Sequence, residues 1–185
     1  MFPRRRGDDP HLLVVGMTGV RMGDRVVQVG CAHGGRLAAV ASKVGLSGRA
    51  VAVVSDEASA ARARKAVENA GVLVDIELTP SAILPVESDA FNLVVVDNTG
   101  GLLTAMHATD RVATFREAFR VLRPGARIVV IGAATRGGLG ALFSRASSGP
   151  SFDPSPFLEA DGFKQVRTLA EKDGLVFVEG VKPRG

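Results

Sequence analysis

Length, composition and charge exclude several classes of protein. The chain has 185 residues, 46% of them hydrophobic and 23% charged, which suits one globular domain with its own core. No apolar run reaches the roughly 20 residues of a membrane span, and the lone cysteine, Cys31, cannot form an internal disulfide and predicts a cytoplasmic protein. The net charge of +4 comes mainly from scattered arginines, with Arg4-Arg5-Arg6 as the only dense cluster and with neither Trp nor Tyr for base stacking. We interpret this cluster as a solvated tail and do not expect a nucleic-acid partner.

Apolar, β-branched runs predict five strands up to residue 131, with helical patterns between them. Because strands and helices alternate, we expect a parallel sheet with helices on both faces. The predicted strands are residues 25–29, 50–54, 72–78, 91–97 and 127–131; the predicted helices are residues 36–44, a helix capped by Ser55 or Asp56 that ends at Gly71, and a helix capped by Asp110 that Pro124-Gly125 breaks.

The end of the chain has a different pattern. Two strand-like runs, 163–170 and 175–181, flank Glu171-Lys172-Asp173-Gly174, and an Asp-Gly pair between strands indicates a hairpin. The Gly-, Ser- and Pro-rich stretch 135–156 is expected to be loop with one short helix near 139–146. The fold class is therefore α/β: a Rossmann-like, doubly wound, mostly parallel seven-stranded sheet with a C-terminal antiparallel hairpin strand and helices on both faces. We assign residues 23–185 to this single domain and residues 1–22 to a segment before it.

A glycine-rich turn follows the first predicted strand. Ligands of open α/β sheets bind outside the carboxyl ends of the strands, and Gly30, Gly34 and Gly35 would let the backbone approach a ligand closely. The turn therefore predicts a site for a nucleoside-bearing cofactor, with a plain tight turn as the alternative. Gly30-x-Ala32-x-x-Gly35 also matches the dinucleotide fingerprint with one substitution, which leaves a nicotinamide cofactor open.

Three segments, in order and spacing, resemble the class I S-adenosylmethionine-dependent methyltransferases. Gly23-Asp24-Arg25-Val26-Val27-Gln28-Val29-Gly30-Cys31-Ala32-His33-Gly34 resembles the family's first motif, Gly-Asp-x-Val-Leu-Asp-x-Gly-Cys-Gly-x-Gly. Residues 84–95 look like its Leu-Pro-Phe-x-x-x-Ser-Phe-Asp-Leu-Val-Val stretch, and residues 115–127 look like its helix, Pro-Gly turn and fifth strand. The closing hairpin agrees with the same family. Within it, the chain is most similar to small-molecule methyltransferases related to the quinone-biosynthesis C-methyltransferases.

The resemblance implies a function and a set of site residues. It implies S-adenosyl-L-methionine as cofactor, a small-molecule methyl acceptor, and an N-terminal segment, residues 1–22, that covers the pocket. The cofactor-binding residues that it implies are Gln28, Gly30, Cys31, Ala32, His33, Gly34, Ser55, Asp56, Ser81, Ala82, Asp97 and Asn98.

The sequence departs from the family at several cofactor anchors. The family's acid at the end of the first strand, which orients the methionine part of the cofactor, aligns with the neutral Gln28, and the middle glycine of the motif is Ala32. The ribose-binding acid aligns with Ser55 or Asp56, and the adenine-contacting Asp aligns with Pro80, where only backbone groups of Ser81 and Ala82 could reach the ring. A methyltransferase-like binding module without catalysis is therefore the second hypothesis. A nicotinamide-dependent oxidoreductase is the third, although a chain without Tyr has no Tyr/Lys catalytic pair.

Methyl transfer depends mainly on alignment of the reacting groups, and a base is needed only if the acceptor must lose a proton. His107 is the candidate base by position, with a solvated loop histidine or a residue at a helix start as the alternatives. No cluster has metal-ligand spacing, so no metal is expected. We expect the apolar segments Leu12–Val15, Phe143 and Phe152–Phe157 to serve helix or core packing. The alternative is that they wall a pocket, for which a partly hydrophobic small molecule would be the natural acceptor.

Overall fold

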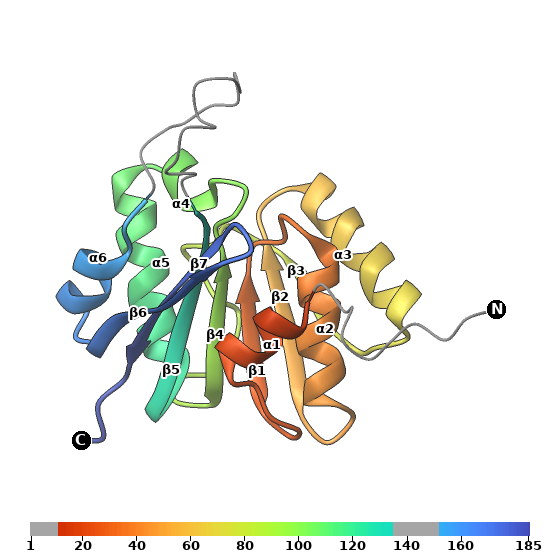
Figure 1. The fold of residues 1–185 in the computed structure, drawn as a ribbon, viewed down its shortest axis with the longest axis horizontal. Helices are drawn as coiled ribbons and strands as arrows, with labels where there is room; N and C mark the ends of the chain where they lie inside the picture. Colours follow the sequence, from red (N-terminus) through yellow and green to blue (C-terminus); the bar gives the residue numbers. More distant parts are fainter. Residues whose placement is uncertain (1–10, 135–151) are drawn as a thin grey trace.

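A seven-stranded sheet with the strand order β3-β2-β1-β4-β5-β7-β6 forms the centre of the molecule (Figure 1). The computed structural model describes residues 11–134 and 152–185. The strands are β1 (Arg25–Val29), β2 (Arg49–Val54), β3 (Asp75–Leu78), β4 (Phe91–Asp97), β5 (Leu122–Ala133), β6 (Lys164–Lys172) and β7 (Leu175–Val181). The helices are α1 (Leu12–Thr18), α2 (Gly34–Val44), α3 (Glu57–Ala70), α4 (Leu102–Ala105), α5 (Ala108–Val121) and α6 (Ser155–Ala160).

The sheet is parallel from β3 to β5 and antiparallel at its end, where β7 pairs with β5 and β6 pairs with β7. This confirms the predicted fold class. The turn between β6 and β7 consists of Asp173 and Gly174, whose φ angles of 55° and 75° are both positive. Such a turn matches the twist of two antiparallel strands, so the Asp-Gly pair accounts for the hairpin.

Helices cover the sheet on both faces, because successive side chains of a buried parallel strand point to opposite sides. On one face, Val14 of α1 and Val40 of α2 pack with Val26 of β1. On the other, Phe115 of α5 and Leu158 of α6 pack with Val27. Apart from the exposed Leu12, the apolar residues of α1 thus contribute to the core.

Three predicted boundaries were wrong by three residues or more. β3 begins at Asp75 instead of residue 72, because the N–H of Val72 donates to the carbonyl of Val67 and still belongs to the C-terminal cap of α3. Helix α5 begins at Ala108 with His107 as its N-cap, so Asp110 lies in the first turn and does not cap the helix.

The third wrong boundary is the start of β5. The strand begins at Leu122 instead of residue 127 and includes Pro124-Gly125. The register with β4 shifts between the pairs Phe91–Leu122 and Leu93–Arg127, and Gly125 has a φ of +81°. The Pro-Gly pair therefore forms an irregularity within the strand, where proline is tolerated.

Some sequence predictions lie outside the described residues: the short helix near 139–146, Phe143 and the Arg4–Arg6 cluster. Among the helices of residues 11–134 and 152–185, none is long and apolar enough to cross a membrane. The same residues contain no group of three or more His, Cys, Asp or Glu side chains placed to hold a metal ion.

Candidate functional site

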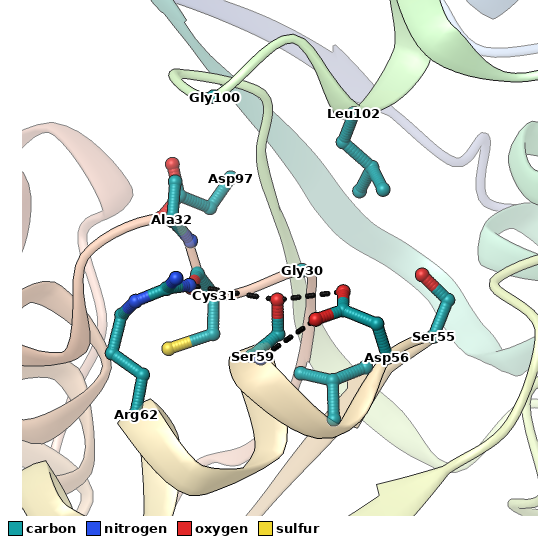
Figure 2. Close-up of a pocket in the computed structure, with 11 residues that line it drawn as sticks. Gly30, Cys31, Ala32, Ser55, Asp56, Ser59, Arg62, Asp97, Gly100 and Leu102 are labelled. Atoms are coloured by element: carbon teal, nitrogen blue, oxygen red, sulfur yellow. Dashed lines mark hydrogen bonds between the residues drawn. The ribbon is translucent and has the colours of Figure 1, made fainter.

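A pocket of about 310 Å³ opens at the carboxyl ends of β1, β2 and β4 (Figure 2). Its position is the one expected for a ligand site in an open α/β sheet, and its volume lies at the lower end of the usual range for small-molecule sites, roughly 300–1,000 Å³. The pocket is lined by Gly30, Cys31, Ala32, Val54, Ser55, Asp56, Ser59, Arg62, Asp97, Gly100 and Leu102.

The turn after β1 requires its glycines. Gly30 has a φ of +80°, and a Cβ there would lie 2.7 Å from Cδ2 of Leu102 and 3.1 Å from the carbonyl oxygen of Asp97. A Cβ on Gly34 would lie 2.5 Å from the Cβ of Ala66 on α3. Gly30 thus lets the backbone turn at the edge of the pocket, and Gly34 lets α2 begin close against α3.

Asp56 marks the β2 side of the pocket. It is the N-cap of α3, and its two carboxylate oxygens accept hydrogen bonds from the N–H and the Oγ of Ser59, both at 2.8 Å. These hydrogen bonds lower the pKa of the Asp56 carboxyl below its usual value, so the group is ionised at neutral pH. The side chain is exposed, and a carboxylate has about four acceptor positions. Asp56 can therefore cap the helix and still accept hydrogen bonds from a ligand.

Arg62 joins α3 to the glycine turn. Its Nη1 donates to the carbonyl oxygen of Cys31 and, at 3.5 Å, to Oγ of Ser59; Figure 2 shows the guanidinium extending from the helix toward Cys31. Burial, followed by the charge of Asp97, raises the pKa of the Cys31 thiol to about 11. The thiol is therefore neutral at physiological pH and is a small apolar wall of the pocket.

Asp97 closes the β4 side of the pocket. Asp97 is 1% exposed. Its Oδ2 accepts hydrogen bonds from the backbone N–H groups of Ala32 at 3.1 Å and His33 at 3.3 Å. Nη1 of Arg36 lies 3.3 Å from Oδ1, and the hydroxyl of Thr99 donates to the same oxygen at 2.7 Å. One buried carboxylate therefore ties the glycine turn, the first turn of α2 and the loop after β4 together.

The structure brings half of the predicted cofactor residues to the pocket. Gly30, Cys31, Ala32, Ser55, Asp56 and Asp97 line it, whereas Gln28, His33, Gly34, Ser81, Ala82 and Asn98 do not. Among the latter, Asn98 is buried and accepts from the N–H of Leu103 at 2.7 Å. His107 is exposed at the N-cap of α5 and lies outside the lining residues.

Five lining residues were not among the predicted cofactor-binding residues: Val54, Ser59, Arg62, Gly100 and Leu102. Ser59 and Arg62 follow Asp56 at steps of three residues, which places all three on one face of a helix, and this spacing was a usable signal. Gly100 and Leu102 reach the pocket through a turn at Gly101, whose φ is +77°. The Gly100-Gly101 pair is a turn signal, but it does not indicate that the turn reaches the pocket.

Comparison with known proteins identifies the family. The model of the family described as "Methyltransferase domain" matches residues 26–125. The methyltransferase GfsG of Streptomyces halstedii is 32% identical over 120 residues, which cover 65% of this chain and 41% of GfsG. The ubiquinone/menaquinone biosynthesis C-methyltransferase UbiE of Cronobacter sakazakii is 29% identical over 118 residues, 62% of this chain and 44% of UbiE. The chain thus spans less than half the length of these curated relatives.

The fold comparison agrees. A crystal structure of a SAM-dependent methyltransferase from Aquifex aeolicus superposes with a TM-score of 0.69 at 19% sequence identity, covering 94% of both chains. Fold and pocket define a Rossmann-like domain with a pocket at the carboxyl ends of its strands. The matched segment, more than half of the chain, shows that it belongs to the methyltransferase domain family. Within that family its fold is that of the S-adenosylmethionine-dependent class.

Proposed function

We propose that this chain binds S-adenosyl-L-methionine in the pocket between β1, β2 and β4 and transfers its methyl group to a small-molecule acceptor. The observation that carries the proposal is the joint placement of the Gly30–Ala32 turn, Asp56 and Asp97 around one pocket, within the segment that matches the family. Each group comes from the end of a different parallel strand, as a shared ligand site requires.

The chemistry of these residues fits the cofactor. Asp56 and Ser55 are exposed oxygen acceptors at the end of β2, suited to the ribose hydroxyls. Two buried polar atoms, Oε1 of Gln28 and Oγ of Ser81, have no hydrogen-bond partner among the described residues, and such atoms are costly unless something pairs with them. Ser81 follows the exposed Pro80, so its hydroxyl is a candidate for the polar contact that Pro80 cannot make.

The protein's part in methyl transfer is to bind and align. When bound, S-adenosylmethionine supplies a methyl group on a positively charged sulfur, which an acceptor can attack directly. Asp56 and the glycine turn would hold the nucleoside end, and the side chains of Val54 and Leu102 would keep water from the pocket wall. His107, on the connection between α4 and α5, is our candidate base for an acceptor that must lose a proton; its exposed position leaves it able to meet an acceptor outside the pocket.

The nature of the acceptor is inferred from the relatives. UbiE is named for quinone biosynthesis, which favours a small molecule. Phe152 and Phe157 pack against the core, as expected, and do not line the pocket: Phe157 stacks on Phe115 at 5.7 Å between ring centroids and contacts Phe152 at 5.3 Å. A partly hydrophobic acceptor therefore stays a prediction, as does a cytoplasmic location, which the free thiol of Cys31 favours.

A binding module without catalysis is the second candidate. The observation that favours it is Gln28, which is neutral and buried where the resemblance implies an acid, and whose Nε2 donates to the carbonyl oxygen of Gly30 at 3.1 Å. A module of this kind would bind the cofactor or its thioether product without transferring a methyl group.

Thermal unfolding with excess S-adenosylmethionine, S-adenosylhomocysteine or NADPH tests the proposal. A ligand at 100 times its dissociation constant stabilises the folded state by about 2.7 kcal/mol, which for a chain of this size raises the midpoint by about 5–10 °C. We expect that shift with both methionine-derived ligands and none with NADPH. A shift of the midpoint with NADPH alone would overturn the proposal. So would the absence of a shift with all three ligands. Binding without methyl transfer to any member of a small-molecule acceptor panel would favour the binding module.

A further inference from the structure

Helix α4 (Leu102–Ala105) forms one wall of the pocket through Leu102. The Leu102 side chain points toward the turn at Gly30 (Figure 2), and a Cβ on Gly30 would lie 2.7 Å from its Cδ2. Isolated helices shorter than about 12–15 residues are marginal in water, so a helix of four residues depends on groups outside it. The position of this wall is therefore set by the side chains that hold α4.

Two side chains hold the peptide groups of Leu103, next to Leu102. Oδ1 of the buried Asn98 accepts a hydrogen bond from the Leu103 N–H at 2.7 Å, and Nε of Arg111 donates one to the Leu103 carbonyl oxygen at 2.7 Å. Nη2 of Arg111 donates a second hydrogen bond, to the carbonyl oxygen of Met106 at 3.1 Å. The last carbonyl groups of a helix have no partner within it. Arg111 thus holds α4 at Leu103 and again just after its end.

Aromatic rings hold the guanidinium of Arg111 in place. Arg111 lies in the first turn of α5, and its guanidinium carbon is 5.2 Å from the ring centroid of Phe152 and 5.7 Å from that of Phe157. Both distances are within the roughly 6 Å at which a ring face attracts a cation. Phe157 in turn stacks on the buried Phe115. Arg111 therefore connects the wall of the pocket to the packed core.

The same arginine holds the connection that carries His107. The backbone N–H of Arg111 donates to the carbonyl oxygen of His107 at 3.0 Å, and its side chain donates to the carbonyl oxygen of the preceding residue, Met106. Two adjacent peptide groups are thus tied to Arg111. The Leu102 wall and the candidate base are held by one side chain and its own backbone.

We propose that Arg111 is a positioning residue for this site: it holds the Leu102 wall against the glycine turn and fixes the place of His107 relative to that wall. This inference rests on the proposed function. Arg111 is not among the described residues that line the pocket, so it acts on a ligand through Leu102. The contribution of Leu102 to ligand affinity should therefore depend on Arg111.

A double-mutant cycle measures this dependence by calorimetric titration with S-adenosylhomocysteine. Leu102→Ala alone should weaken binding by about tenfold, the effect expected for removing buried methyl and methylene groups from a contact. Arg111→Met keeps an apolar stem and removes the donors, and it should weaken binding by about tenfold because the wall moves. In the Arg111→Met background, Leu102→Ala should then cost less than about threefold, because residues that act through one structural element are not additive.

Arg120→Met is the matched control. Arg120 also lies in α5 and donates to two backbone carbonyl oxygens, those of Leu84 at 2.9 Å and Val86 at 3.1 Å, but neither residue belongs to the described lining of the pocket. Its replacement should lower the thermal midpoint, and Leu102→Ala should still cost about tenfold in its background. A merely structural role for Arg111 predicts the same additivity in Arg111→Met, so the coupling distinguishes positioning from general stability.

Arg111→Lys tests the assignment even if Arg111→Met does not fold. Lysine keeps the positive charge and lacks the planar fork of donors, so Leu102→Ala should cost about three- to fivefold in this variant. A cost of about tenfold in the folded Arg111 variants, or no loss of affinity in Leu102→Ala alone, would overturn the assignment while the proposed function stands. A wild-type protein that does not bind S-adenosylhomocysteine would overturn both.

Discussion

Asp97 and Glu179 are both buried carboxylates paired with arginines, and they lie in different parts of the sheet. Their side chains are 1% and 5% exposed. Glu179 lies within β7, between Arg127 of β5 at 3.3 Å and Arg167 of β6 at 3.2 Å. Asp97 ends β4 and accepts hydrogen bonds from the backbone of the glycine turn. Burial and ion pairing are thus common to both, whereas their other hydrogen-bond partners and their place in the fold differ.

This difference separates the scaffold, by which we mean the strands that the Glu179 ion pairs connect, from the pocket beside Asp97. Arg127 also donates to the carbonyl oxygen of Gly19 at 3.1 Å, so the Glu179 ion pairs connect three neighbouring strands to the end of α1. The groups around Asp97 belong to loops and to a helix start that surround a pocket. A buried ion pair is weak evidence of function by itself; its location at the carboxyl end of a parallel strand, beside a glycine turn, is the informative feature.

The largest expected effect comes from Gly30→Ala. An L-residue at a φ of +80° costs roughly 1–2 kcal/mol, and the new Cβ would lie 2.7 Å from Cδ2 of Leu102, so the turn must shift into the pocket. We expect a lower thermal midpoint and no detectable binding of S-adenosylhomocysteine by calorimetry.

Gly174→Ala, in the hairpin next to β7, is the control for Gly30→Ala. Its φ is +75°, and a Cβ there would have no heavy atom of the described residues within 4 Å. It should cost roughly 1–2 kcal/mol of stability and leave S-adenosylhomocysteine binding intact. If Gly30→Ala and Gly174→Ala both lose S-adenosylhomocysteine binding, or both retain it, the pocket cannot be distinguished from the rest of the fold by this test and the prediction is wrong.

A moderate effect is expected from Asp56→Ala. Loss of the N-cap costs about 1 kcal/mol, and loss of a carboxylate acceptor for the ligand lowers the affinity for S-adenosylhomocysteine by about tenfold. Asp56→Asn caps a helix as well as Asp does, so it should restore stability and not the full affinity. Chemical unfolding and calorimetry on both variants measure the two effects. Unchanged affinity in Asp56→Ala would reduce Asp56 to a helix cap.

The smallest expected effect is a change in the alkylation rate of the Cys31 thiol. This rate tests whether the charge of Asp97 raises the pKa of a group that lines the pocket. With a pKa of about 11 against an ordinary 9.0, the folded protein at pH 8 has about 100-fold less thiolate than the unfolded chain. Because the sequence has no other cysteine, the alkylation rate reads this thiol alone. Alkylation should be slow in the wild type, faster in Asp97→Asn, and unchanged in Glu179→Gln.

The same shift sets a direction for stability against pH. Above pH 9 the unfolded chain releases the Cys31 proton while the folded chain retains it up to about pH 11, so the contribution of Cys31 to stability is complete below pH 9 and is lost as the pH rises through 11. Cys31→Ala should remove this component of the pH dependence of the free energy of unfolding.

Equal alkylation rates in the wild type and in Asp97→Asn would contradict the prediction on the thiol, because they would show that the charge of Asp97 does not affect the pKa of Cys31.

The sequence predicted most of the strands because burial of both faces leaves a clear pattern. β1 and β4 were predicted residue for residue, since Val26-Val27 and Leu93–Val96 are continuous apolar runs. The boundaries that failed depend on hydrogen bonds that such runs do not reveal, such as the cap at Val72. Pro124-Gly125 was expected to end a helix, and tertiary pairing placed it inside a strand instead.

The sequence predicted the pocket residues that lie at the ends of strands. It did not predict contacts between long side chains that come from different elements. Gly30, Asp56 and Asp97 follow strands, and they line the pocket as their positions suggested. The pairing of Arg36 with Asp97 joins residues 61 positions apart and follows only from the register of β1 with β4. The motif shows that the family's acid is replaced by Gln28. It does not show that the carboxylate of Asp97, from the neighbouring strand β4, accepts hydrogen bonds from the same glycine turn.

Equilibrium dialysis with radiolabelled S-adenosylmethionine tests the central claim most directly. We predict saturable binding of one cofactor per chain, displaced by S-adenosylhomocysteine, retained in Gly174→Ala and lost in Gly30→Ala. The absence of saturable binding to the folded wild-type chain, or binding that Gly30→Ala leaves unchanged, would contradict the claim that this pocket is the cofactor site.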